Sequence, residues 1–157
     1  AFVCVSQSWG IGRDGALLFR ISADLKRFKA LTVGKTVILG RKTLDTFPGG
    51  KPLKDRRNIV LSRRELDIPG AEIAHSFEEA AALGGDDAIV IGGASVYMAL
   101  LSRCDRVYVT KVDAAPDADS FFPDLDDNPD WRVASESEVF EENGLKFRFV
   151  DYIRNCN

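Results

Sequence analysis

The amino-acid sequence predicts an α/β protein. We expect a central, mostly parallel twisted sheet of about eight strands, with helices on both faces and an antiparallel hairpin at the C-terminal end. Three observations predict this fold class. Short β-branched apolar runs alternate with helical patterns, as in sheets with crossover helices. Two of these runs end in glycine directly before a helical pattern. The last two strand patterns flank Asn143-Gly144, a dipeptide typical of hairpin turns.

Strands are predicted where short apolar runs are bounded by turn residues. These runs are residues 2–7, 37–39, 58–61, 73–74, 88–91, 106–112, 131–140 and 145–153. Phe147 and Phe149 alternate along the last run, which predicts a place in the core rather than a surface for stacking bases. Glycines mark residues 10–15 as a loop, and acidic residues mark 113–129 as a longer one.

Helices are predicted from their start and stop signals. Ser22 is expected to be the N-cap of a helix that runs to about residue 31. Ser76 and Glu79 have the spacing of a capping box, and the helix that follows them ends at Gly84-Gly85. Two further helices are predicted, a short one after Thr43 and another after Gly93 that runs to residue 101.

Length and composition predict one globular domain over residues 1–157. The hydrophobic fraction of 45% is too high for a disordered chain. No apolar run approaches the ~20 residues that span a bilayer, and no signal segment precedes the first strand. Cys4, Cys104 and Cys156 are far apart and lack metal-site spacing, which argues against a disulfide-stapled secreted domain and predicts a cytoplasmic location.

The charges are unevenly distributed along the chain. Residues 1–64 hold 14 Lys and Arg against four Asp and Glu, whereas residues 65–157 hold seven against 20. A basic first part favours an anionic ligand there, although the two parts could also simply neutralise each other in the folded protein. The isoelectric point near 5.2 argues against general binding to nucleic-acid backbones.

Asp24 is the first candidate functional residue. In the predicted helix it shares a face with Phe28 and Leu31, so its carboxylate lies on an apolar stripe. A carboxylate there is unfavourable unless it is paired, which favours a functional role. The alternative is an ordinary first-turn Asp that interacts with the helix dipole.

Two glycine-containing junctions could bind phosphate. Gly40 ends a strand, and Arg41, Lys42 and Thr43 follow at a helix start, where backbone amides, positive charge and a hydroxyl would meet. Residues 91–95 also run from a strand through paired glycines into a helix, but they lack the full spacing of a dinucleotide-binding fingerprint. The alternatives are a solvated basic turn and a tight strand-to-helix turn.

Isolated basic residues give weaker signals. Ser62 and Arg63 follow a strand and could reach a further phosphate, and Arg56 follows the apolar Leu53 and is suited to a forked contact with a carboxylate. Each could instead be a solvated surface charge. His75 is the only histidine and has no nucleophile near it in the sequence, so a Ser-His-Asp triad has little support.

Six short motifs occur in one order along nearly the whole chain. They are Val5-Ser6-Gln7 with Gly10-Ile11-Gly12, Ala23-Asp24-Leu25-Lys26-Arg27-Phe28, Ile38-Leu39-Gly40-Arg41-Lys42-Thr43, Pro52-Leu53 with Arg56 and Asn58-Ile59-Val60-Leu61-Ser62, Val90-Ile91-Gly92-Gly93 with Val96-Tyr97, and Tyr108-Val109-Thr110. In order and spacing, the series resembles the dihydrofolate reductase family.

This resemblance implies reduction of 7,8-dihydrofolate to 5,6,7,8-tetrahydrofolate, with hydride transfer to C6 and protonation at N5. Asp24 matches the family's acidic residue, which binds the 2-amino group and N3 of the pterin and assists protonation. Thr110 would hydrogen-bond near Asp24, partly through water. Arg56 matches the arginine that binds the α-carboxylate of the glutamate tail. The other substrate-binding residues would be Phe2, Val3, Cys4, Leu25, Phe28, Phe47, Leu53 and Ile91.

The resemblance also implies NADPH as the cofactor and no metal. Gly92-Gly93 matches a pair joined by a cis peptide bond next to the pyrophosphate. Two arginines near the adenosine 2′-phosphate favour NADPH over NADH. The cofactor-binding residues would be Cys4, Ile11, Gly12, Gly40, Arg41, Lys42, Thr43, Leu61, Ser62, Arg63, Ile91, Gly92, Gly93, Ala94, Ser95, Val96 and Tyr97.

The segment before the Asp24 helix departs from the family pattern. Leu18-Phe19 stands where the family carries Pro-Trp, and Phe19 cannot donate the hydrogen bond with which that Trp helps to order a water. Leu17 stands where relatives have a loop residue that covers the nicotinamide. Leu17 and Phe19 therefore join Asp24 in the expected catalytic set, on a mobile loop over residues 10–19.

Two other functions compete with this interpretation. One is a non-catalytic NADPH-binding module, and the other is a related-fold pyrimidine reductase of riboflavin synthesis, against which Asp24 and Arg56 together argue. The expected partners are dihydrofolate and antifolate inhibitors, bound to a monomer. Neither a nucleic acid nor a membrane is expected.

Overall fold

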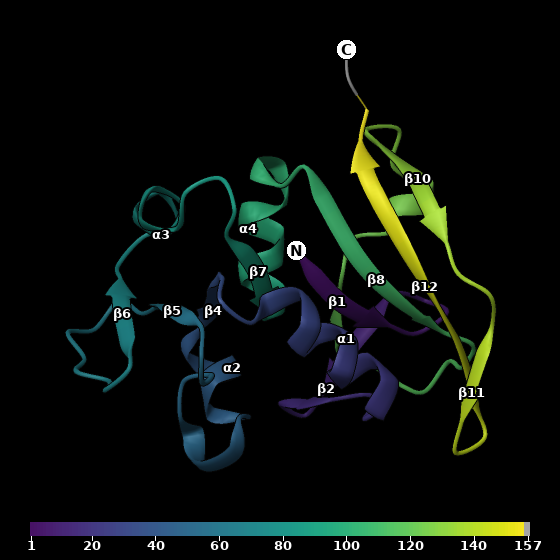
Figure 1. Cartoon of the computed structure of the whole chain (residues 1–157), viewed down its shortest axis with the longest axis horizontal. Coiled ribbons are helices and arrows are strands. Elements are labelled where there is room, and N and C mark those ends of the chain that lie inside the picture. The colour runs from purple at the N-terminus through teal and green to yellow at the C-terminus, as the bar shows by residue number, and fades with distance from the viewer. Residues whose placement is uncertain (156–157) are drawn as a thin grey trace. The chain divides into compact units, whose positions relative to one another are not determined.

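The computed structural model describes residues 1–155, which form two compact units (Figure 1). Unit 1 comprises Ala1–Lys26 and the described part of Ser102–Asn157, and unit 2 comprises Arg27–Leu101. The assignment of one domain stays a prediction. Cys156 lies outside the described residues. Within these residues, no helix combines the length and the apolarity needed to cross a lipid bilayer.

Unit 1 contains a five-stranded mixed sheet. Its strands are β1 (Phe2–Val5), β8 (Arg106–Val112), β10 (Trp131–Glu136), β11 (Phe140–Glu142) and β12 (Leu145–Arg154). β1 and β8 pair in parallel, whereas β12 runs antiparallel to β8, β10 and β11. The expectation of a mostly parallel sheet of about eight strands is therefore not confirmed, because the long β12 returns beside β8 in the opposite direction.

The C-terminal hairpin is confirmed, although its first strand is interrupted. Asn143 and Gly144 have positive φ angles of 52° and 81°, as the two central residues of a tight hairpin turn require. The predicted strand 131–140 divides into β10 and β11. At the division, the Phe149 amide donates to the Ser137 hydroxyl at 2.8 Å, so a side chain replaces one backbone acceptor, while the Ser137 amide still donates to the Phe149 carbonyl.

The predicted loops over residues 10–15 and 113–129 are wrong in part, because both segments contribute strands to a small antiparallel sheet in unit 1. Its strands are β2 (Gly10–Arg13), β3 (Ala16–Leu17) and β9 (Ser120–Phe121). A 3-10 turn follows at Leu125–Asp127. Asp14 and Gly15 have φ angles of 52° and 80°, so residues 10–17 form a second hairpin. The Asp-Gly pair is itself a hairpin signal, but its flanking strands are too short to show clear alternation.

Unit 2 has a wholly parallel sheet, as alternating strands and helices predict. Its strands are β4 (Thr36–Gly40), β5 (Arg57–Leu61), β6 (Ala71–Ala74) and β7 (Ile89–Gly92), in the order β6-β5-β4-β7. In the register, Gly40 lies opposite Leu61, and Leu39 lies opposite Gly92. The carboxyl ends of three strands therefore meet at one edge, which is where open α/β sheets bind their ligands.

The first helix is α1 (Ser22–Thr32). Five further α-helical or 3-10 segments follow it up to residue 103. They are α2 (Arg41–Asp45), the 3-10 segments Pro48–Gly50 and Leu101–Arg103, α3 (Phe77–Gly84) and α4 (Ala94–Leu100). One half of the predicted capping box is confirmed: the Ser76 hydroxyl accepts from the Glu79 amide at 3.0 Å. The Glu79 carboxylate accepts from the His75 amide instead of the Ser76 amide. The short helix predicted after Thr43 begins earlier, at Arg41.

Each unit has its own buried apolar cluster. In unit 2, Val37, Leu39, Leu44 and Val60 are at most 1% exposed. In unit 1, the buried cluster consists of Ile21, Val112 and Phe147, with Phe149 packed against it, which confirms the core placement of both phenylalanines. Burying one such side chain contributes about 1.5–3 kcal/mol, so these clusters hold the strand ends that carry the candidate site.

Candidate active site

Asp24 is buried and directly hydrogen-bonded. It lies in the first turn of α1 and is 9% exposed. The Thr110 hydroxyl, on β8, donates to the Asp24 Oδ1 atom at 2.5 Å, and Thr110 itself is fully buried. A hydrogen bond to a carboxylate favours its charged form and fixes its orientation. The sequence predicted this pairing in part through water, whereas the structure shows a direct contact.

Strand β1 lies beside this pair. Cys4 is opposite Thr110 in the β1–β8 register, and the neighbouring Phe2 and Val3 are buried. Burial raises the pKa of the Cys4 thiol, and the negative charge of Asp24 raises it further. Cys4 is therefore a neutral thiol at physiological pH and is not activated as a nucleophile. Its contribution to the site is a small, apolar surface next to the carboxylate.

The candidate residues in the segment before α1 differ in their burial. Phe19 packs against the cluster of Ile21, Val112 and Phe147, together with Cys4. Ile11 is buried on β2, whereas Leu17 on β3 is 73% exposed. The structure thus brings Phe19 and Cys4 into one apolar cluster and leaves Leu17 at the surface. The catalytic assignment of Leu17 and Phe19 stays a prediction.

A residue that sequence reasoning missed binds the start of α1. The helix begins at Ser22, so the N-cap position falls on Ile21, whose side chain has no acceptor. Glu142 of β11 supplies the acceptors: its carboxylate accepts from the Ser22 amide at 2.7 Å and from the Ala23 amide at 3.2 Å. No local signal could reveal this contact, because about 120 residues separate the partners.

In unit 2, the Arg56 guanidinium is held by its neighbours. Nε donates to the Thr32 hydroxyl at 3.0 Å, and Nη1 donates to the Lys54 carbonyl at 2.8 Å. The guanidinium carbon lies 5.8 Å from the centre of the Phe28 ring. Burial lowers the pKa of Arg56, and the nearby Asp55 carboxylate offsets part of this effect. An oriented, partly desolvated guanidinium is suited to binding a carboxylate.

Asn58 supports the loop that carries Arg56. It is 1% exposed on β5, and its amide nitrogen donates to the carbonyls of Leu53 and Arg56 at 2.9 and 3.0 Å. Its side-chain oxygen accepts from the Leu53 amide at 3.0 Å. A polar residue within an apolar strand pattern is the sequence signal for this role, which was not predicted.

The remaining substrate-pocket candidates are apolar. Phe47, Leu53 and Ile91 pack against the buried cluster of unit 2. Leu25 is 48% exposed on α1, which leaves its side chain accessible to a ligand. Their common feature is partial exposure, as expected of residues that line a site rather than fill a core.

The glycine junctions predicted to bind phosphate lie at the carboxyl edge of the unit 2 sheet. The Gly92–Gly93 peptide bond is cis. A Cβ atom added at Gly40 would lie 3.2 Å from a Val96 methyl carbon, and one added at Gly93 would lie 3.2 Å from the Thr43 hydroxyl. The β4–α2 and β7–α4 junctions therefore approach each other as closely as glycine allows, and both helices begin after a glycine with no side-chain cap.

Basic side chains surround the same edge. Arg41 is exposed and forms an ion pair with Asp45, and Lys42 and Arg63 are also exposed. The Ser62 hydroxyl accepts from the Arg64 amide at 3.1 Å. His75, for which no catalytic role was predicted, contacts the Ser62 carbonyl through its Nδ1 atom at 3.0 Å.

The other cofactor candidates occupy the start of α4 and the end of β5. Val96 and Tyr97 are buried, Ala94 is partly buried and Ser95 is exposed. A Cβ atom at Gly92 would lie 3.6 Å from the Tyr97 hydroxyl oxygen, so the ring of Tyr97 reaches back to the glycine pair. Leu61 lies opposite Gly40 in the sheet register.

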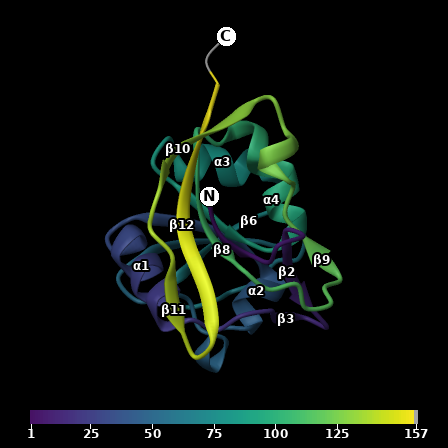
Figure 2. The ribbon, with the colours of Figure 1, turned by 90° about the vertical axis from the view of Figure 1, so that its right-hand side faces the viewer.

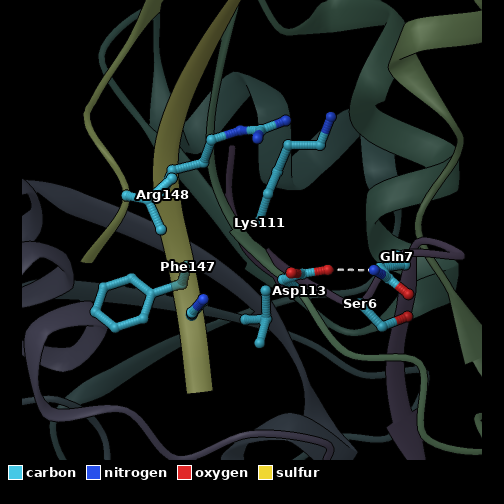
Figure 3. Close-up of a pocket in the computed structure, with 9 residues that line it drawn as sticks. Ser6, Gln7, Lys111, Asp113, Phe147 and Arg148 are labelled. Carbon is cyan, nitrogen blue, oxygen red and sulfur yellow. Dashed lines mark hydrogen bonds between the residues drawn. The ribbon is translucent and has the colours of Figure 1, made fainter. Parts of the chain in front are cut away.

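A hollow of about 330 Å³ on unit 1 contains none of the candidate site residues (Figure 3). It is lined by Ser6, Gln7, Lys111, Val112, Asp113, Val139, Lys146, Phe147 and Arg148. Among these lining residues, the Gln7 side-chain amide donates to the Asp113 carboxylate. Among the described residues, no group of three or more His, Cys, Asp or Glu could hold a metal ion.

Comparisons with known proteins agree with the sequence resemblance. The family model described as "Dihydrofolate reductase" matches residues 1–154. Dihydrofolate reductase from Neisseria meningitidis serogroup B is 40% identical over 148 residues, which cover 92% of this chain and 90% of that protein. Dihydrofolate reductase type 3 from Salmonella typhimurium is 43% identical over 117 residues, covering 73% and 71%.

A solved structure shows the same similarity in three dimensions. Dihydrofolate reductase from Enterococcus faecalis, complexed with NADP(H) and RAB-propyl, superimposes with a TM-score of 0.88 at 28% sequence identity. The match covers 99% of this chain and 95% of that chain.

Proposed function

The chain belongs to the dihydrofolate reductase family, and we propose that it reduces 7,8-dihydrofolate to 5,6,7,8-tetrahydrofolate with NADPH at a site centred on Asp24. The observation that carries this proposal is the buried hydrogen bond from Thr110 to the Asp24 carboxylate. It holds a single anion, oriented and largely removed from water, in the position that the family's pterin-binding acid occupies in the sequence pattern.

Asp24 binds the pterin ring and favours its protonation. Its carboxylate accepts hydrogen bonds from the 2-amino group and N3, which present two donors side by side. Burial strengthens this interaction because the carboxylate has little competing water. The negative charge stabilises the positive charge that develops when N5 gains a proton, and electrostatic stabilisation by one such group contributes roughly 10²–10³-fold.

The residues at the carboxyl edge of the unit 2 sheet fit NADPH. A side chain at Gly40 or Gly93 would press closely on Val96 or Thr43, and the glycines leave the backbone amides accessible to a pyrophosphate. Arg41, Lys42 and Arg63 supply positive charge for the phosphates. When bound, NADPH supplies the hydride that reaches C6 of the substrate. The chain binds and orients the two molecules and excludes water from the reacting atoms.

Arg56 recognises the glutamate tail of the substrate. Its contacts with Thr32 and Lys54 fix the guanidinium before substrate binds, which reduces the entropy lost on binding. Phe47, Leu53 and Phe28 bind the apolar middle of the substrate, and antifolate inhibitors bind at the same site. We further propose that the enzyme is monomeric and cytoplasmic.

Mixing the purified chain with NADPH and dihydrofolate tests this function. We expect the absorbance of the reduced nicotinamide to fall and tetrahydrofolate to form in equal amounts. Binding of NADPH without turnover would instead indicate a non-catalytic module, and turnover only with a pyrimidine intermediate of riboflavin synthesis would indicate the related reductase. Either result would refute the proposal.

A further inference from the structure

We propose that Glu142 is a positioning residue for Asp24, acting through the first turn of α1. This inference rests on the proposed function, since it concerns the residue that binds the pterin. Glu142 lies on β11, close to α1 in space but far from it in the sequence (Figure 2). It does not need to touch the substrate to affect the reaction.

Glu142 replaces a local helix cap. The first amides of a helix have no partner within the helix, and Ile21 at the N-cap position has no acceptor in its side chain. Both oxygens of Glu142 are used, one for the Ser22 amide and one for the Ala23 amide. Ala23 directly precedes Asp24, so the cap fixes the backbone immediately before the residue that carries the carboxylate.

Glu142, which binds the backbone before Asp24, and Thr110, which binds its side chain, belong to the same five-stranded sheet. Glu142 pairs with Leu145 at the start of β12, and Phe149 of β12 pairs with Thr110 of β8. Thr110 in turn binds the Asp24 carboxylate. The backbone before Asp24 is therefore attached to β11 and the end of its side chain to β8, two strands that both pair with β12, which leaves the carboxylate little freedom to move.

Electrostatics reinforce the contact. Hydrogen bonds from the Ser22 and Ala23 amides lower the pKa of Glu142, and the positive charge of Lys26 lowers it further. The carboxylate is therefore charged at neutral pH, and a negative charge at a helix N-terminus is favourable. Without it, the first turn of α1 would have two unsatisfied amides and would fray more readily.

Three variants separate positioning from simple stability. Glu142→Ala removes both acceptors, Glu142→Gln retains one oxygen acceptor, and Glu141→Ala is the matched control on the same strand, where Glu141 is exposed and pairs with Lys146. The readouts are kcat/KM for dihydrofolate, the Kd for NADPH and the midpoint of urea unfolding. Kinetics are measured at a temperature at which every variant is folded.

We expect Glu142→Ala to lower kcat/KM for dihydrofolate about fivefold, as the loss of a helix cap predicts, with Glu142→Gln intermediate. The NADPH Kd should stay unchanged, and Glu141→Ala should match the wild type. The double variant Thr110→Val/Glu142→Ala should lower kcat/KM by less than the product of the two single fold reductions, since both substitutions act on the Asp24 carboxylate.

A different pattern would overturn the inference. If Glu142→Ala lowers the unfolding midpoint but keeps the wild-type kcat/KM, the contact serves stability alone. If the double variant lowers kcat/KM by the full product of the two single fold reductions, Glu142 does not act through Asp24. Failure of the wild-type chain to reduce dihydrofolate would contradict the proposed function instead, so the two failures are distinguishable.

Discussion

The Asp24 carboxylate is useful because its surroundings fix it before any ligand arrives. Thr110 donates to Oδ1, and β1 presents the neutral Cys4 thiol nearby. A buried carboxylate that is already oriented loses little entropy when it binds a pterin and retains a strong charge–dipole interaction. The family motif predicted the residue, but only the structure shows how directly its partner contacts it.

Removing the Thr110 hydroxyl should impair turnover more than folding. A hydrogen bond to a charged group contributes about 1.5–3 kcal/mol, so we expect Thr110→Val to reduce kcat/KM about 10- to 100-fold. Thr110→Ser keeps the hydroxyl and should retain most of the activity. Steady-state kinetics on the two variants check this. Equal activity in both would mean that the hydrogen bond to Asp24 has no role in catalysis.

Arg56 should govern substrate binding rather than the chemical step. We expect Arg56→Gln to raise the KM for dihydrofolate about tenfold or more, because a charged contact with the glutamate carboxylate is lost, while kcat changes little. Arg57→Gln is the matched control: Arg57 is exposed and pairs with Glu72. A similar rise in KM in both variants would show that Arg56 has no specific contact with the substrate.

At the scale of elements, the sequence predicted the wholly parallel part of the fold best. Strands β4, β5 and β7 are short apolar runs, and helices directly follow β4 and β7. The apolar pattern and the turn residues that bound it are both local signals. The interrupted β10 and β11 and the small β2–β3–β9 sheet were missed. Their formation depends on the Ser137 hydroxyl and on pairing between segments about 110 residues apart, which no local pattern shows.

The β11–β12 turn gives a clean test of backbone conformation. Gly144 has φ +81°, and a Cβ atom added there would have no atom within 4 Å. Gly144→Ala should therefore destabilise the protein by about 1 kcal/mol through the left-handed conformation alone. Urea unfolding measures the change, with Glu141→Ala as the control on the same hairpin. No loss of stability would show that the turn adopts another conformation.

Across the whole molecule, acid should destabilise the fold through particular carboxylates. Hydrogen bonds from Arg57 lower the pKa of Glu72, and those from the helix start lower that of Glu142. Burial alone would raise the pKa of Asp126, but hydrogen bonds from Lys111 and Tyr152 outweigh it, so this pKa is also lowered. A lowered folded-state pKa stabilises the protein fully above the ordinary pKa and loses this effect as pH falls through the folded value.

These three carboxylates should therefore leave the urea midpoint unchanged from about pH 7 to pH 5. Below about pH 4.5 the midpoint should fall, because carboxylates of the unfolded chain take up protons there. Asp126→Asn should be less stable than the wild type at neutral pH and should lose less stability on acidification. Parallel curves for the wild type and this variant across the acid range would show that Asp126 does not contribute to the pH dependence.

The site as a whole was predictable where its chemistry lies in contiguous motifs. Asp24, Gly40 and Gly92 sit in short segments whose order along the chain identifies the family. Glu142 and Asn58 were not identified, because their roles arise only when folding places their side chains on distant or looped backbone. The residues that we propose to contact ligands thus lie in motifs that are visible in the sequence, whereas the contacts that hold them in place require the structure.

The most direct test of the central claim is the rate of NADPH oxidation by Asp24→Asn with dihydrofolate, measured against pH beside the wild type. Asparagine preserves the size of the side chain and removes the charge. We predict a rate at pH 7 lower by at least about 100-fold, with partial recovery at acid pH, where the substrate itself becomes protonated. A rate at pH 7 close to that of the wild type would contradict the assignment of Asp24 as the residue that binds and helps to protonate the pterin.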